Sequence, residues 1–115
     1  MRVILYHNPR CSKSRRALEL IRAAGYEPII IDYLKTPLDV GGLADLHKKL
    51  AVPVRDMMRH GEAIYKTLNL AAEESETALL AAMAAHPILL ERPVIVTDKG
   101  ALIGRPPEKL HDILT

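Results

Sequence analysis

Two short apolar runs with a helical pattern between them place the strongest constraint on how this chain can fold. The first run is Val-Ile-Leu-Tyr at residues 3–6, and the second is Ile-Ile-Ile at residues 29–31. Between them, Leu18 and Ile21 have the spacing of a buried helix face, and Gly25 favours the end of that helix. A strand, a helix and a strand of this length predict a βαβ unit, whose two strands are parallel.

The segment that joins the first run to the helix, residues 7–16, reads His-Asn-Pro-Arg-Cys-Ser-Lys-Ser-Arg-Arg and holds the only cysteine. Ser12 or Ser14 is expected to cap the helix, so Cys11 lies where a strand passes into a helix N-terminus. Helix N-termini favour anions, and cationic neighbours lower cysteine pKa values from about 8.5 to between roughly 3.5 and 7.5. Because Pro9 is the only apolar residue around it, we expect Cys11 to be a reactive thiolate rather than a buried hydrophobic residue.

From about residue 35 to residue 90 the pattern becomes helical and irregular, which predicts a helical insertion. Thr36-Pro37 is expected to begin one helix, and Ser75 to cap another that ends before Pro87. The insertion therefore separates the βαβ unit from the remaining C-terminal elements.

After the insertion, residues 94–97 and 101–103 flank an Asp-Lys-Gly turn and predict an antiparallel β-hairpin. Leu110 and Ile113 mark a last helix. The predicted fold class is α/β: a four-stranded mixed sheet flanked by helices, in a single domain over residues 1–115.

The composition excludes several classes of protein. A formal net charge of +2 over 115 residues argues against a general nucleic-acid binder, and one cysteine excludes an internal disulfide. A free reactive thiol suits a reducing compartment, so we expect a cytoplasmic protein. No stretch approaches the roughly 20 apolar residues of a membrane span. We expect a monomer, because no apolar stripe is left over by the predicted packing.

Three arginines stand at boundaries of the predicted elements: Arg59, Arg92 and Arg105. The planar guanidinium group binds tetrahedral oxyanions through paired N–H donors, so arginines that converge on a thiolate would form an oxyanion site. Taken singly, each is better explained as an exposed surface arginine, since spacing alone does not show convergence. The other histidines lack metal-ligand spacing, so we expect no metal site; they are His47, His60, His86 and His111.

Two common cysteine motifs are absent. The phosphatase loop needs an arginine six positions after its cysteine, where this chain has Ala17. The dithiol redox motif needs a second cysteine three positions on, where this chain has Ser14. Redox chemistry at Cys11 would therefore lack a resolving thiol within the chain.

Three blocks resemble the glutaredoxin-linked arsenate reductase family, in its short form, within the thioredoxin superfamily. They are His-Asn-Pro-Arg-Cys-Ser-Lys-Ser-Arg at residues 7–15, His-Pro-Ile-Leu-Leu-Glu-Arg-Pro-Val-Ile-Val at 86–96, and Gly-Arg-Pro-Pro at 104–107. The likeness spans essentially the whole chain. It implies a thioredoxin-like fold with a helical insertion, and a cis peptide bond before Pro93 beside the active site.

The resemblance also implies roles for individual residues. Cys11 would be the nucleophile, with His7 and Ser14 supporting its thiolate. The implied oxyanion binders are Arg59, Arg92 and Arg105, whereas Arg15 would either touch the anion or only order the loop.

The resemblance implies reduction of arsenate to arsenite, and hence a part in arsenic resistance. Reduction takes two electrons and this chain offers one thiol, so the second thiol must come from outside; the resemblance names glutathione as co-substrate and glutaredoxin as partner, with no bound cofactor. Two alternatives stay open: a glutathione-dependent thiol reductase of another substrate, and a non-enzymatic regulator of the same superfamily that binds RNA polymerase. Such regulators typically carry the dithiol motif, which Ser14 removes.

Overall fold

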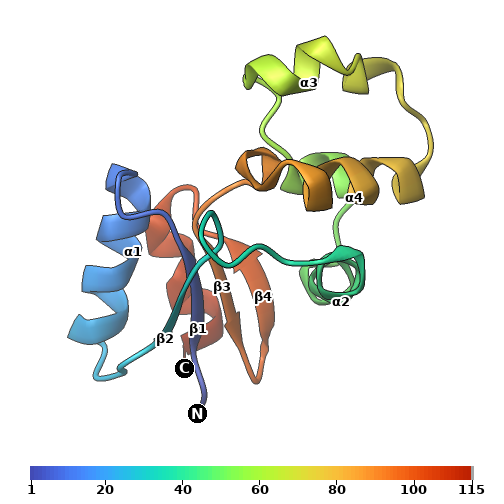
Figure 1. Ribbon diagram of the computed structural model, residues 1–115. Helices are drawn as coiled ribbons and strands as arrows, with labels where there is room; N and C mark the ends of the chain where they lie inside the picture. The colour runs from blue at the N-terminus through green and yellow to red at the C-terminus, as the bar shows by residue number, and fades with distance from the viewer. Residues whose placement is uncertain (115) are drawn as a thin grey trace. The chain divides into compact units, whose positions relative to one another are not determined.

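The computed structural model describes residues 1–114, in which the chain forms two compact units (Figure 1). The sheet unit comprises Met1–Thr36 and Arg92–Thr115, and the helical unit comprises Pro37–Glu91. The helical unit coincides closely with the insertion that the sequence predicts. That the chain forms a single domain stays a prediction.

The sheet unit contains the predicted four-stranded mixed sheet. Its strands are β1 (Ile4–His7), β2 (Ile29–Asp32), β3 (Val94–Thr97) and β4 (Gly100–Ile103), in the order β2-β1-β3-β4. β1 and β2 are parallel, as the βαβ pattern requires, and β3 is antiparallel to both β1 and β4. The βαβ unit and the hairpin are thus confirmed, and β1 and β3 occupy the centre of the sheet.

Helices pack on the sheet to form the core of this unit. α1 (Ser12–Ala23) and the C-terminal segment, made of η4 (Pro107–Leu110) and α5 (His111–Leu114), lie side by side against it (Figure 1). Burial of each large aliphatic side chain contributes about 1.5–3 kcal/mol, which makes this cluster the main stabilising element of the unit. The buried members are Val3, Leu5, Ala17, Ile21, Ile95, Leu110 and Leu114.

The ends of α1 agree only partly with the prediction. Gly25 has φ +93° and follows the last helical turn, its N–H bonded to the Arg22 carbonyl, so the expected glycine stop is confirmed. The expected serine cap is wrong. Cys11 itself is the N-cap residue, and its side chain makes no capping hydrogen bond.

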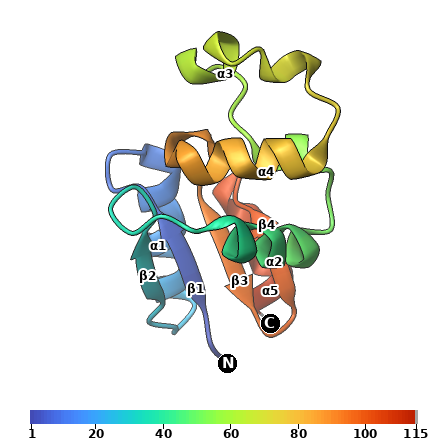
Figure 2. The same ribbon diagram turned by 45° about the vertical axis from the view of Figure 1, so that its right-hand side comes forward.

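In the helical unit α4 (Glu76–Ala85) lies between α2 (Val40–Leu50) and α3 (Ala63–Thr67), as the two views show (Figures 1 and 2). Ser75 caps α4 as predicted, accepting a hydrogen bond from the Ala78 N–H. The predicted helix start at Thr36-Pro37 is wrong, because Asp39 is the N-cap of α2 and accepts from the Gly42 N–H at 2.7 Å. The elements are α2 (Val40–Leu50), η1 (Val54–Met57), α3 (Ala63–Thr67), η2 (Leu70–Ala72), α4 (Glu76–Ala85) and η3 (Pro87–Leu89).

A single arginine, Arg55, forms hydrogen bonds to three segments of the helical unit. The Nη1 of Arg55 donates to the Tyr65 hydroxyl at 2.7 Å and to the Leu70 carbonyl at 2.9 Å, and its Nη2 donates to the Glu73 carbonyl. The ring of His60 stacks on that of Tyr65, with centroids 4.9 Å apart. Arg55 therefore has a structural role that its position in the sequence does not reveal.

β2 is an edge strand and exposes apolar side chains. Ile29 is 44% exposed and Ile30 is 42% exposed, so part of the second apolar run faces solvent. The reason for expecting a monomer, that no apolar stripe is left over, does not hold on this strand. The oligomeric state stays a prediction.

Neither a membrane-spanning helix nor a metal-ligand cluster occurs among residues 1–114. No helix in this part of the chain is long and apolar enough to cross a bilayer. Within the same residues, no group of three or more histidine, cysteine, aspartate or glutamate side chains could hold a metal ion.

Candidate active site

A tight turn carries the chain from β1 into α1 and delivers Cys11 to the helix N-terminus. The Cys11 N–H donates to the Asn8 carbonyl at 2.9 Å, and the Asn8 side-chain oxygen accepts from the Arg10 N–H at 3.0 Å. An asparagine that bonds to the backbone two residues ahead is a common way to stabilise such turns. The turn therefore sets the position of Cys11 through main-chain and local contacts.

Cys11 occupies the N-cap of α1 with an extended backbone, φ −93° and ψ 122°. The first intrahelical hydrogen bond runs from the Arg15 N–H to the Cys11 carbonyl at 3.0 Å. The amides of residues 12–14 precede that bond and carry the partial positive charge of the helix start. Cys11 is partly exposed, so the residue at this anion-favouring helix terminus is in contact with solvent.

Ser14 is fully buried and turns towards the strand rather than towards the helix end. Its Oγ lies 2.6 Å from His7 Nδ1 and accepts a hydrogen bond from the Asn8 N–H at 3.0 Å. These contacts explain why Ser14 does not cap the helix. Its hydroxyl links the last residue of β1 to the first turn of α1. The contact therefore joins the two ends of the loop that holds Cys11.

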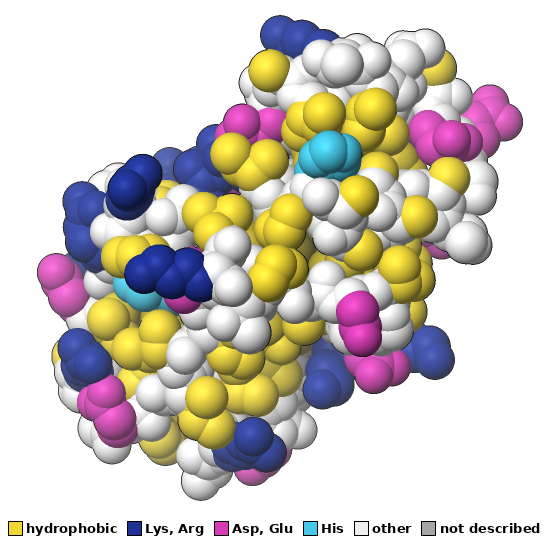
Figure 3. Space-filling model, in the orientation of Figure 1, with side chains coloured by type: hydrophobic (Ala, Val, Ile, Leu, Met, Phe, Trp, Pro, Cys, Tyr) yellow, Lys and Arg dark blue, Asp and Glu magenta, His cyan; other side chains and the backbone are white. Residues whose placement is uncertain are grey.

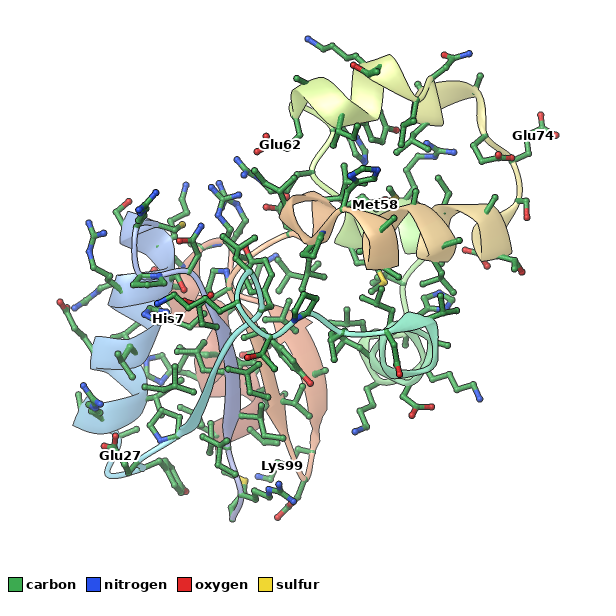
Figure 4. The ribbon with its side chains drawn as sticks, in the orientation of Figure 1. His7, Glu27, Met58, Glu62, Glu74 and Lys99 are labelled. Atoms are coloured by element: carbon green, nitrogen blue, oxygen red, sulfur yellow. The ribbon has the colours of Figure 1, made fainter. Side chains whose placement is uncertain are left out.

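His7 is 7% exposed, and its surroundings favour the neutral imidazole. Burial lowers the pKa of His7; nearby Asp32 opposes this effect, while Arg15 and Arg22 lower the pKa further. His7 pairs with Asp32 in the β1–β2 register, which explains their closeness. Figure 4 shows His7 at the end of the sheet unit opposite Lys99, which lies at the β3–β4 turn.

Arg15 orders the loop. Its Nη1 donates to the Pro9 carbonyl at 2.9 Å across the turn, and its side chain is otherwise exposed. The resemblance left open whether Arg15 touches the anion or only orders the loop, and the hydrogen bond to Pro9 is a contact of the second kind. Lysine and arginine side chains gather around this start of α1 on the surface (Figure 3).

Arg92 and Arg105 are joined around Pro93 at the start of β3. The Nη1 of Arg105 donates to the Arg92 carbonyl at 3.1 Å, and the Nε and Nη1 atoms of Arg92 are buried. The Arg92–Pro93 peptide bond is cis, as the resemblance implied, and so is Arg105–Pro106, which was not expected.

Strand register brings the cysteine loop and this arginine pair to one edge of the sheet. Tyr6 pairs with Val94, and Val94 pairs with Ile103, so the end of β1, the start of β3 and the end of β4 are neighbours. His7 follows Tyr6 directly, and Arg105 lies two residues beyond Ile103. Residues far apart in the sequence therefore meet at one edge, a convergence that spacing alone could not show.

Gly104 closes the packing at this edge, and the sequence interpretation did not single it out. Its N–H donates to the Pro93 carbonyl at 2.8 Å. A Cβ atom at Gly104 would lie 3.0 Å from both Pro93 Cγ and Ile95 Cδ1. A side chain there would push on the proline beside Arg92. In the sequence Gly104 was noted only as the first residue of the Gly-Arg-Pro-Pro block, without a role of its own.

Arg59 belongs to the helical unit, where the structure describes its contacts. Its N–H donates to the Leu89 carbonyl at 2.8 Å, and its guanidinium group forms an ion pair with Glu62. Sequence interpretation identified Arg59 but missed Glu62, although a separation of three residues between opposite charges was a visible signal.

Comparison with known proteins gives consistent matches over nearly the whole chain. The model of the ArsC family matches residues 6–113. The protein named YfgD of Escherichia coli, described as uncharacterized, is 49% identical over 114 residues, covering 97% of this chain and 96% of its own. A protein named arsenate reductase of Haemophilus influenzae is 45% identical, covering 99% of this chain and 100% of its own.

Solved structures confirm the fold. A structure titled arsenate reductase from Vibrio cholerae superposes with a TM-score of 0.96 at 48% identity, covering 99% of this chain and 98% of its own. The matches confirm the resemblance found in the sequence and the thioredoxin-like α/β fold that it implied.

Proposed function

The chain belongs to the ArsC family, and on that premise we propose that it is an oxidoreductase that reduces arsenate to arsenite through Cys11. Relatives named arsenate reductase at 45% and 48% identity support this activity. The single observation that carries the proposal is the placement of Cys11, a partly exposed cysteine at the N-cap of α1, in the loop between the buried, hydrogen-bonded residues His7 and Ser14.

In this proposal Cys11 attacks arsenic as a thiolate, which is the nucleophilic form of a cysteine side chain. Ser14 accepts the Asn8 N–H and contacts His7 Nδ1. When the neutral imidazole carries its proton on Nδ1, His7 donates a hydrogen bond to Ser14 Oγ. The Ser14 hydroxyl can then donate its own hydrogen bond to the Cys11 sulfur. His7 then acts through Ser14 as a positioning residue.

The proposed oxyanion binders are Arg59, Arg92 and Arg105. Arginine forks bind tetrahedral oxyanions through paired N–H donors, and they offset the negative charge that would otherwise repel a thiolate. The hydrogen bond from Arg105 to the Arg92 carbonyl supports a joint role for these two residues. Arg59 enters on the family resemblance alone.

The electrons require a second thiol, for which we propose glutathione. The Cys11 thiolate attacks arsenic(V) and forms a sulfur–arsenic bond, while one arsenate hydroxyl takes up a proton from solvent and leaves as water. A glutathione thiolate then attacks the sulfur of that adduct; a disulfide forms between the two sulfurs, the bonding pair passes to arsenic, and arsenic(III) leaves as arsenite. Glutaredoxin, with a further thiol, reduces the Cys11–glutathione disulfide and restores the thiolate. The chain offers one cysteine, so no internal disulfide competes.

A coupled assay tests this function. Purified protein is incubated with glutathione, glutaredoxin, glutathione reductase and NADPH, and arsenate-dependent NADPH oxidation is followed. We expect turnover in the wild type and its loss in Cys11→Ser. Absence of arsenate dependence, under conditions where a characterised arsenate reductase turns over, would refute the proposal; turnover with a glutathione mixed disulfide in place of arsenate would favour the thiol reductase alternative.

A further inference from the structure

One of the proposed anion-binding arginines, Arg59, already forms an ion pair with a carboxylate of the protein. In the helical unit, Nη1 of Arg59 pairs with Oε1 of Glu62 across the turn that leads into α3. The side chains are 28% and 22% exposed, so the pair is partly removed from water. A partly desolvated pair is held more firmly than the ion pairs on the surface, which contribute little.

Glu62 occupies the N-cap position of α3, where a side chain commonly accepts a hydrogen bond from the first helical turn. The Glu62 side chain makes no such capping bond, and its carboxylate reaches back to Arg59 instead. Helix capping therefore does not account for this carboxylate.

The main chain on either side holds the pair in place. The Arg59 N–H is bonded to the Leu89 carbonyl, and Met58 forms an antiparallel bridge with Leu90. At the other end, the Tyr65 N–H donates to the Glu62 carbonyl. Figure 4 shows Glu62 and Glu74 at opposite ends of the helical unit, with Met58 between them. Main-chain hydrogen bonds therefore hold the backbone at both residues, and a change of side-chain rotamer suffices to separate the pair.

We propose that Glu62 is a specificity-determining residue that competes with the oxyanion for Arg59. Without substrate, the Glu62 carboxylate neutralises the Arg59 guanidinium group. An oxyanion that binds Arg59 must displace this carboxylate, and the bound oxyanion then lies near the negative charge of Glu62. The penalty is larger for a dianion than for a monoanion, because like charges repel in proportion to their product. This inference rests on the proposed function, in which Arg59 binds the substrate anion.

The first test measures the ion pair without substrate. Phenylglyoxal modifies accessible arginine side chains, and mass spectrometry of the digested protein gives the labelling rate of Arg59. We expect Glu62→Gln to raise that rate roughly twofold to fivefold, since an ion pair that is partly exposed is worth that factor in an equilibrium. Glu74→Gln, which removes the same charge from an exposed position of the same unit, is the matched control and should leave the rate unchanged. Equal rates in all three proteins would overturn the proposal.

The second test adds arsenate as the probe and measures the concentration that halves the labelling of Arg59. We expect that concentration to fall roughly twofold to fivefold in Glu62→Gln and to stay constant in Glu74→Gln. The shift should shrink at lower pH, where arsenate passes from dianion to monoanion. An unchanged protecting concentration in Glu62→Gln, or no protection by arsenate in any variant, would overturn the proposal.

The coupled turnover assay separates this inference from the function on which it rests. Turnover with arsenate together with an Arg59 that arsenate never protects would remove Glu62 and Arg59 from the site and leave the reductase function standing. Protection that shifts in Glu62→Gln without any turnover would refute the reductase function and leave the competition between Glu62 and the anion in place.

Discussion

The Nδ1 atom of His7 lies 2.6 Å from the Oγ atom of Ser14, although seven residues separate them in the chain. His7 ends β1 and Ser14 lies in the first turn of α1, so this contact joins a strand to the helix that follows it. The loop between them carries Cys11. The position of the cysteine therefore depends on a buried polar pair rather than on the loop alone.

Ser14→Ala is expected to destabilise the protein by about 1–3 kcal/mol, because it leaves the Asn8 N–H and His7 Nδ1 without their buried partner. Denaturant unfolding followed by circular dichroism measures the change. Ser12→Ala is the matched control on the exposed side of the same turn, and should change stability by less than about 0.5 kcal/mol. Equal stabilities of the two variants would contradict the structural role of the pair.

The stability of the sheet unit is expected to fall in acid because of His7. Burial lowers the pKa of His7 in the folded state, whereas the unfolded chain returns it to about 6.5. Below about 6.5 the unfolded state therefore binds more protons than the folded state, and the free energy of unfolding decreases by at most about 1.4 kcal/mol per pH unit for this group.

His7→Asn should flatten that dependence, which urea unfolding between about pH 7 and about pH 5 measures. His111→Asn removes an exposed histidine and should keep the wild-type slope. If His7→Asn and the wild type lose stability equally between these pH values, His7 is not the residue that titrates.

Gly104→Ala is expected to cost about 1–3 kcal/mol, because the added Cβ meets Pro93 and Ile95 at 3.0 Å in a packed edge of the sheet. Thermal or urea unfolding reports the loss. Gly61→Ala provides the control, since no atom lies within 4 Å of the Cβ it would add. A Gly104→Ala protein as stable as Gly61→Ala would show that the neighbours move aside without cost.

Arg55→Met should destabilise the helical unit by about 1–3 kcal/mol, since it removes the donor shared by the Tyr65 hydroxyl and the Leu70 carbonyl. Hydrogen exchange of the amides in residues 60–75 measures local opening, and we expect faster exchange there than in the wild type. Lys66→Met removes a positive charge from an exposed site nearby and is expected to leave exchange unchanged. Protection that survives in Arg55→Met would contradict the role assigned to this arginine.

The elements of the sheet unit could be predicted from the sequence because the signals that define them are local. Residues 3–6 and 29–31 are apolar runs of strand length, and Gly25 ends the helix between them through a positive φ. The hairpin of β3 and β4 follows from two short runs around a glycine-containing turn. Local backbone preference and hydrophobic period suffice for these elements.

The predicted helix starts were wrong where a residue forms a hydrogen bond that its local sequence does not indicate. Ser14 looks like a helix cap in the sequence, but its hydroxyl is bonded to His7 and Asn8. Thr36 resembles a helix start, yet its N–H closes a turn on the Asp32 carbonyl, and Asp39 caps α2 instead. A residue that can make several hydrogen bonds takes the partner that the fold offers, and propensity does not reveal which one that is.

By itself the sequence determined the lone cysteine at a strand-to-helix junction, the α/β class and the family, because each depends on residue identity and order. The tertiary structure alone decided that the end of β1, the start of β3 and the end of β4 are neighbours, which brings Arg105 to the Arg92 carbonyl, and that Glu62 pairs with Arg59. The physical reason is that strand register and side-chain direction are set by packing across the fold, so charges distant in the sequence meet only when the chain has folded.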